Sequence, residues 1–178
     1  MSKITDMKKI VFVCGLIGGL ITTVWMVVLS ILYRTHGEID HGEIYGYGSM
    51  ILAFSLIYVG VRNFRNKNNN GVISFGKAFR IGLYITLIAS TIYVCTWQVI
   101  YYGYARDFGK VYEESSLAKL KVSGVTKEVY AKKKAEMDSW VKMYDMPAYN
   151  VGMTYMEILP VGLLVSLITA LILKKKRI

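Results

Sequence analysis

The sequence predicts an all-α integral membrane protein: a four-helix transmembrane bundle with an extracytoplasmic helical hairpin between its third and fourth spans. Two observations support this fold class. Hydrophobic residues make up 54% of the chain and charged residues only 19%. The charges are also nearly absent from four long stretches and crowded between them. A soluble helix needs a wet face and mixes the two kinds of residue, so this segregation indicates that lipid covers the apolar surface.

Each apolar stretch is long enough to be a membrane span, because about 20 mostly apolar residues cross roughly 30 Å of hydrocarbon. The first is too long for a cleaved signal peptide, so we expect it to be retained. With the hairpin at 105–150, the spans form a single predicted domain covering 1–178. The spans cover about 10–33, 44–61, 81–104 and 151–173.

The distribution of lysine and arginine predicts the orientation. The N-terminal segment, the 62–80 connection and the C-terminal tail together hold twelve basic residues against one acid, Asp6, whereas the other side holds ten of each. Both termini are therefore predicted to be cytoplasmic, with anionic lipid as a partner at that face. The net charge of +10 does not predict nucleic acid binding, because no recognition motif accompanies it.

Aromatic side chains gather toward the opposite, outer ends of the spans, where their amphipathic rings are expected to form an interfacial belt. The members of this predicted belt are Tyr33, Tyr45, Tyr47, Trp97, Tyr101, Tyr102, Tyr104, Tyr149 and Tyr155.

The two longer connections carry turn and helix signals. Asn68–Gly71 is a strong turn signal, and the apolar residues after it predict an interfacial lead-in to the third span. Beyond that span, helical spacing predicts that its helix can continue until Ser123-Gly124, after which Thr126 caps a second helix ended by Met146-Pro147. We expect the apolar stripe of this hairpin, which includes Trp140 and Tyr144, to pack against itself rather than lie on the membrane or bind a partner.

Glu157 is the only acid inside a span, and intramembrane carboxylates often mark ion or proton pathways. Pro160 removes a helix hydrogen bond three residues later and Gly162 thins the helix, a pattern typical of broken helices in transporters. Depth favours a structural role instead, because Glu157 lies about 24 Å from the inner boundary. There it can snorkel outward or pair with Arg106 or a tyrosine hydroxyl.

Other chemistry-bearing residues have weaker patterns. The segment from His36 to Glu43 holds both histidines and three carboxylates, but its order matches no zinc signature, so no metal site is predicted. Cys14 and Cys95 lie at different depths and are not expected to pair. The small residues from Gly15 to Gly19 favour close helix packing within the bundle over dimerisation. No catalytic set and no cofactor motif is found, and we expect the protein not to be an enzyme.

The succession of several motifs resembles the domain of unknown function 4199 family. The segment Gly71-Val-Ile-Ser-Phe-Gly-Lys-Ala-Phe79 leads into a helix carrying Thr86-Leu-Ile-Ala-Ser90. The last span carries Glu157-Ile-Leu-Pro160-Val-Gly162, then Ser166-Leu-Ile-Thr-Ala170 and a lysine-rich tail. This resemblance implies a small bacterial inner-membrane protein with four helices, and it implies no activity or ligand.

Two functions remain open at this point. The first is a non-enzymatic interaction or scaffold module that binds a protein partner through the 105–150 hairpin. The alternative is a small transporter or channel that uses Glu157 beside a helix break at Pro160. Because four helices leave little room for a pathway, this alternative would require a homo-oligomer.

Overall fold

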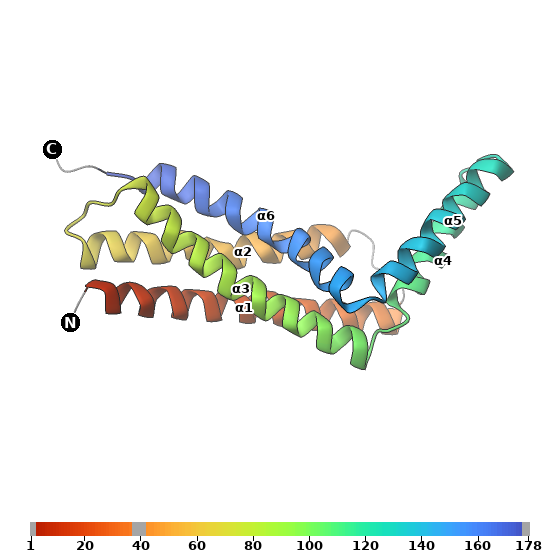
Figure 1. Ribbon diagram of the computed structural model, residues 1–178, viewed down its shortest axis with the longest axis horizontal. Helices are drawn as coiled ribbons and strands as arrows, with labels where there is room; N and C mark the ends of the chain where they lie inside the picture. The colour runs from red at the N-terminus through yellow and green to blue at the C-terminus, as the bar shows by residue number, and fades with distance from the viewer. Residues whose placement is uncertain (1–2, 37–41, 176–178) are drawn as a thin grey trace. The chain divides into compact units, whose positions relative to one another are not determined.

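The four apolar stretches form long helices in the computed structural model, which describes residues 3–36 and 42–175. No strand is found in these ranges, and one isolated β-bridge joins Ile73 to Lys175. The all-α prediction is confirmed (Figure 1). The described elements are α1 (Lys3–His36), α2 (Gly42–Asn63), the π-helical segment η1 (Phe64–Asn68), α3 (Phe75–Gly103), α4 (Phe108–Val122), α5 (Lys127–Tyr144) and α6 (Pro147–Leu173).

Four of these helices are long and apolar enough to cross a membrane, as predicted. Within the most apolar part of each, only 33% to 44% of the residues are buried. Large hydrophobic side chains therefore cover much of the outer surface, which is compatible with a multi-pass membrane protein. The four segments are Asp6–Tyr33, Ile44–Asn68, Phe75–Gly103 and Pro147–Leu173.

The third helix begins six residues earlier than the predicted start at residue 81. Its first turn is capped by the hydroxyl of Ser74, which accepts a hydrogen bond from the backbone N–H of Lys77 at 3.4 Å. The turn signal before it is confirmed, because Asn70 and Gly71 have φ angles of 53° and 76°. The predicted lead-in therefore becomes the first turns of α3, and the charged residues of this segment do not interrupt the helix.

The prediction that the third helix continues toward Ser123 is wrong. It ends at Gly103, where the backbone N–H groups of Tyr104 and Ala105 both donate to the carbonyl of Ile100. A turn follows, and α4 starts afresh at Phe108. Across this turn, Trp97 of α3 packs against Phe108 of α4.

The chain divides into two compact units. The first, here called the bundle, comprises Met1–Thr96 and Tyr155–Ile178, and the second, the hairpin unit, comprises Trp97–Thr154. The boundaries fall inside α3 and α6, so the hairpin unit contains the end of one span, α4, α5 and the beginning of the next span. Each unit has its own buried residues.

The core of the bundle is formed where α2, α3 and α6 pack against one another. Phe54, Ile57, Ile85 and Ile158 are at most 1% exposed. Lipid tails are as apolar as these side chains, so burial from water cannot drive the helices together within a bilayer. Close packing and hydrogen bonds between helices must supply the stability instead.

Glycine allows α1 to approach its neighbours closely. A Cβ atom on Gly15 would lie 2.8 Å from the Cβ of Ile88, and one on Gly19 would lie 2.7 Å from the Cδ1 of Ile92. Gly18 faces the backbone of Ala53 in α2, with a corresponding distance of 3.4 Å to the carbonyl oxygen. The small residues of α1 therefore pack inside the bundle, as the sequence analysis favoured.

Hydroxyl groups link α3 to α6 through a buried hydrogen bond and to α1 through a partly buried one. The Oγ1 of Thr86 lies 3.2 Å from the Oγ of Ser166, which itself donates to the carbonyl of Gly162 at 2.7 Å. Since a hydroxyl has one hydrogen, Thr86 is the donor to Ser166. Thr23 of α1 and Thr96 of α3 form a second link of 3.1 Å.

Replacement of Gly162 by alanine should destabilise the bundle, because the added Cβ would overlap the Cγ2 of Thr86 and lie 2.8 Å from the Cζ of Phe54. Overpacking of this kind costs about 1–3 kcal/mol. Gly76→Ala is the matched control, since its Cβ would meet nothing within 4 Å. Unfolding in detergent, followed by circular dichroism, should show a lower free energy of unfolding for Gly162→Ala only. An equal free energy of unfolding in the two variants would contradict this packing.

Candidate functional site

Glu157 lies on the outside of the bundle, on an exposed position of α6. The phenol of Tyr93 in α3 donates a hydrogen bond to its Oε1 at 3.3 Å. Of the two partners considered from the sequence, the structure thus selects a tyrosine hydroxyl, and Arg106 instead pairs with Asp145 in the hairpin unit. An exposed carboxylate with one hydrogen-bond donor can accept a proton or a cation from its surroundings.

The other two candidate residues do not join Glu157 in one site. Pro160 is exposed, whereas Gly162 is buried against Thr86 and Phe54. The helix also remains helical through Pro160, so the predicted helix break is wrong. Packing of Gly162 against α2 and α3 holds this part of α6 in place, which explains why one missing backbone hydrogen bond does not interrupt the helix.

A second polar contact lies between the same two helices. The hydroxyl of Tyr155 is 3.1 Å from the Oγ1 of Thr91, and Thr91 donates to the carbonyl of Leu87 at 2.8 Å. Tyr155 is therefore the donor of the first bond. The residue spacing along α6 directs Tyr155 and Glu157 to different sides of the helix, so the two tyrosine contacts are separate.

The remaining candidates are the segment from His36 to Glu43 and the two cysteines. Most of the segment from His36 to Glu43 lies outside the described residues, and the side chains at its two ends are not described either. Among the described side chains, no group of three or more His, Cys, Asp or Glu is placed to hold a metal ion. Cys14 and Cys95 are free, as expected from their depths.

The hairpin unit contains two antiparallel helices, α4 and α5, that pack against each other (Figure 1). Leu117 and Met137 are buried between them, and the rings of Tyr112 and Trp140 lie 5.7 Å apart. A Cβ on Gly109 would be 3.4 Å from the Cγ1 of Val141. The apolar stripe therefore packs against itself, which confirms the favoured prediction.

The tip of this helix pair has the predicted signals. Gly124 adopts a φ angle of 71°, and the hydroxyl of Thr126 accepts a hydrogen bond from the backbone N–H of Val129 at 3.4 Å. Glu128 accepts hydrogen bonds from its own backbone N–H and from Thr126, and these bonds lower the pKa of its carboxyl below the ordinary value. The break and the cap are both confirmed.

Aromatic rings form the base of the hairpin unit. Trp97 meets Phe108 edge to face at 5.3 Å, Tyr101 meets Tyr144 at 5.4 Å, and Trp140 stacks on Tyr144 at 4.8 Å. These separations lie in the range where aromatic pairs add about 0.5–1.5 kcal/mol beyond area burial. The rings come from α3, α4 and α5, so the cluster joins all three helices.

Hydrogen bonds connect this cluster to α6. The amide of Gln98 donates to the Oδ1 of Asn150 at 2.8 Å, and Asn150 donates to the carbonyl of Tyr144 at 3.2 Å. Within the cluster itself, the indole of Trp97 in α3 donates to the hydroxyl of Tyr144 in α5 at 3.0 Å. The aromatic rings and these bonds together are called the root of the hairpin unit below.

The root was not identified in the sequence analysis, although two signals for it were present. Gln98 is the only amide side chain in the third span, and Asn150 immediately precedes the fourth. Polar side chains at such positions need partners. Tyr101, a member of the predicted interfacial belt, is packed inside this unit: it is only 1% exposed, and its hydroxyl donates to Asp145 at 3.4 Å.

Charge is unevenly distributed along the hairpin. Residues 117–134, at its tip, contain six lysines against the single acid Glu128, a net charge of +5. Residues 105–116 and 135–150 contain three basic residues against six acids, a net charge of −3. Two of these acids face each other: burial and a hydrogen bond with Asp138 raise the pKa of Glu113. The tip is therefore a cationic surface, with its lysines exposed to solvent.

Comparison with family models identifies the family of this chain. The model of the family described as protein of unknown function (DUF4199) matches residues 14–175, which is nearly the whole chain. The chain belongs to this family. No curated protein and no solved structure matched the chain in the corresponding comparisons.

Membership of the DUF4199 family confirms the resemblance drawn from the motifs of α3 and α6. The match extends from Cys14 in α1 to Lys175 beyond α6, so it includes both the bundle and the hairpin unit. The hairpin is thus within the part of the chain that the family model covers, rather than a separate addition to it.

The root makes a testable contribution to the stability of this DUF4199 chain. Asn150 is fully buried, and Asn150→Ala would leave the amide of Gln98 without its acceptor. Loss of a buried hydrogen-bond partner costs about 1–3 kcal/mol. Hydrogen exchange should become faster in α4 and α5. Asn66→Ala, at an exposed position of η1, is the control, and unchanged exchange in Asn150→Ala would contradict the role given to the root.

Proposed function

We propose that this protein is a non-enzymatic membrane interaction module in the bacterial inner membrane, and that the tip of its hairpin binds an acidic protein surface on the extracytoplasmic side. The orientation rests on the excess of basic residues around the opposite ends of the spans. The hairpin connects the third and fourth spans, so both of its ends belong to the extracytoplasmic side in this orientation.

The observation that carries the proposal is the separation of charge along the hairpin. A net charge of +5 at the tip lies on lysines whose side chains are exposed, while the acids are concentrated nearer the root. Complementary charge steers association and selects partners, and it acts over roughly 8 Å at physiological salt. A cationic tip therefore favours a partner with acidic groups.

The packing of the hairpin supports the same conclusion. The aromatic residues of α5 are used internally, in the stack of Trp140 on Tyr144 and in the contact of Trp140 with Tyr112. Val122 is 90% exposed at the tip. The surface available to a partner is therefore the lysine-rich tip rather than the apolar stripe.

This geometry also decides where a crosslinker should be placed. Trp140 and Tyr144 of the apolar stripe lie within the packed hairpin, and Tyr144 is only 8% exposed, so neither is a suitable attachment point. A photo-crosslinking residue at Val122, introduced into the full chain in native membranes, should capture one discrete protein with an acidic surface. The yield should fall as salt increases, because screening weakens the attraction.

Charge reversal provides the decisive comparison for the tip. Lys132→Glu/Lys133→Glu/Lys134→Glu should abolish the crosslink from Val122, whereas Lys110→Glu/Lys142→Glu, nearer the root, should leave most of it. A crosslink that is insensitive to both variants, or only self-crosslinked chains, would count against the proposal. Circular dichroism of each variant checks that the helices are retained.

A second candidate function, a small homo-oligomeric transporter or channel, has one observation in its favour. Glu157 sits on the outer surface of the bundle with Tyr93 as its donor, where a second copy could cover it and form a pathway between protomers. The surface position favours a pathway between copies over one through a single bundle. The continuous helix at Pro160 gives this candidate no further support.

Proton flux into proteoliposomes tests this second candidate. If Glu157 conducts protons, Glu157→Gln should reduce the flux at least tenfold, on the order expected for loss of the only ionisable group in the pathway. Tyr155→Phe is the matched control, because it removes a hydroxyl from the other polar contact of the same helices. Flux that is equal in the wild type and in Glu157→Gln would exclude the role.

A further inference from the structure

At the end of the bundle opposite Glu157 along α6, η1 and the connection after it meet the segment that follows α6. The backbone N–H of Ile73 donates to the carbonyl of Lys175 at 3.0 Å, and the N–H of Lys175 donates back to Ile73 at 2.9 Å. The guanidinium of Arg65 in η1 donates to the carbonyl of Leu173 at 3.3 Å. Hydrogen bonds therefore hold the segment after α6 against η1 and the connection between η1 and α3.

This fastening places cations from three segments around one buried apolar patch. Phe64, Ile73 and Leu173 form the patch and are at most 3% exposed. The ammonium of Lys77 lies over the ring of Phe64, 4.9 Å from its centroid, Arg65 follows Phe64 directly, and Lys175 is paired with Ile73. These three cations are called the basic triad.

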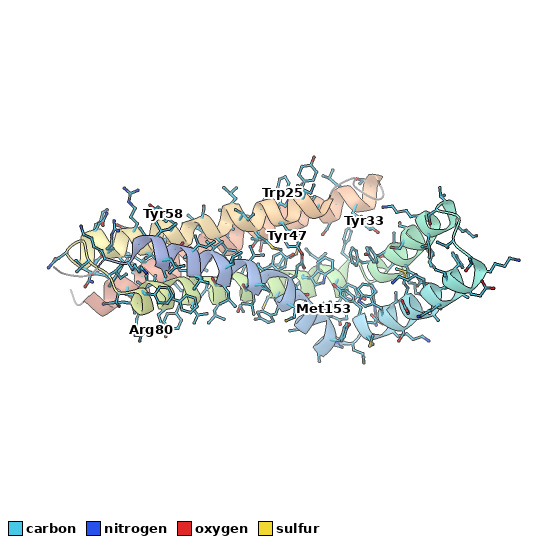
Figure 2. All side chains as sticks on the ribbon, turned by 90° about the horizontal axis from the view of Figure 1, so that it is seen from above. Trp25, Tyr33, Tyr47, Tyr58, Arg80 and Met153 are labelled. Atoms are coloured by element: carbon cyan, nitrogen blue, oxygen red, sulfur yellow. The ribbon has the colours of Figure 1, made fainter. Side chains whose placement is uncertain are left out.

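Further basic residues lie close to the triad in the sequence. Figure 2 shows Arg80 on α3 near this end of the bundle. None of the ion pairs between described side chains involves the triad or its basic neighbours, and Arg65 uses its Nε to bind only the neutral amide of Asn66, at 2.9 Å. The exposed neighbours are Arg62, Lys67, Arg80 and Lys174.

Exposed hydrocarbon lies directly beside these charges in the sequence. Two residues after Ile73, Phe75 is 37% exposed and stacks on Phe79 at 6.1 Å. Just before the tail, Leu171 and Ile172 are 49% and 62% exposed. A free phosphate ion would use the cations alone, whereas a phospholipid would also cover the apolar surfaces of α3 and α6. The combination therefore favours a lipid.

We propose that the basic triad binds the headgroup phosphate of an anionic phospholipid whose acyl chains lie along α3 and α6. A zwitterionic headgroup brings its own ammonium ion and cannot neutralise the triad, so binding selects anionic lipid. Each Lys or Arg near such a headgroup contributes an attraction that corresponds to roughly a fivefold gain in affinity. The site lies in the bundle and does not depend on the proposed partner of the hairpin tip.

Lipid titration of the purified full chain, followed by native mass spectrometry, tests this site. Phosphatidylglycerol should bind at least about tenfold more tightly than phosphatidylcholine. The variant Arg65→Gln/Lys77→Gln/Lys175→Gln should lose this preference. The control Lys132→Gln/Lys133→Gln/Lys134→Gln removes the same number of charges from the hairpin tip and should keep it. Equal loss in both variants would show a general charge effect and overturn the proposal.

Two further measurements complete the test. Millimolar inorganic phosphate should not displace phosphatidylglycerol. Displacement would mean that the triad binds free phosphate, and this would overturn the lipid assignment. If the triple variant fails to fold, Lys77→Gln and Lys175→Gln are measured singly, since Lys175→Gln keeps the backbone bonds to Ile73. Each should lower the affinity for phosphatidylglycerol several-fold, and unchanged affinity in both would refute the site.

Discussion

The close approach of α3 and α6 is the constraint on which the rest of the bundle depends. Gly82 leaves the space that Ser166 occupies, since a Cβ there would lie 2.7 Å from its Oγ, and Gly162 leaves the space for Thr86. The buried bond between Thr86 and Ser166 fixes the register of the two helices. Because apolar burial cannot drive association within lipid, this register sets both the Tyr93–Glu157 contact and the meeting of Ile73 with Lys175.

The two cationic surfaces differ in how their charges are held, and the difference matches their proposed ligands. The triad lies on backbone fastened by hydrogen bonds, with Lys77 against Phe64. A fixed set of donors of this kind suits a compact phosphate, because little side-chain freedom is lost on binding. The lysines of the hairpin tip are spread over the exposed surface of a helix pair, and a distributed set of charges suits steering toward a broader acidic surface.

The spans were predictable because burying charge in lipid is costly, so each span is a long stretch of sequence with almost no charged residues. The start of α3 was not, because Lys77 and Arg80 lie inside its first turns without interrupting them. The end of the third helix at Gly103 was not predictable either. It depends on packing around the turn at 104–107, and no residue pattern in that segment indicates a turn. The root was missed for a similar reason: Gln98 and Asn150 are 52 residues apart, and one sequence does not show that two polar side chains meet.

The surface position of Glu157 restricts the roles that this acid can have. A carboxylate has two oxygens with several acceptor sites, and Tyr93 satisfies one of them on the described surface. Within hydrocarbon, leaving the other acceptor sites of the carboxylate without donors would cost free energy. Glu157 therefore needs headgroups or water at the outer interface, or groups from a second copy. Any transport role for Glu157 therefore depends on assembly. The sites proposed at the hairpin tip and at the basic triad, by contrast, each use residues of one chain alone.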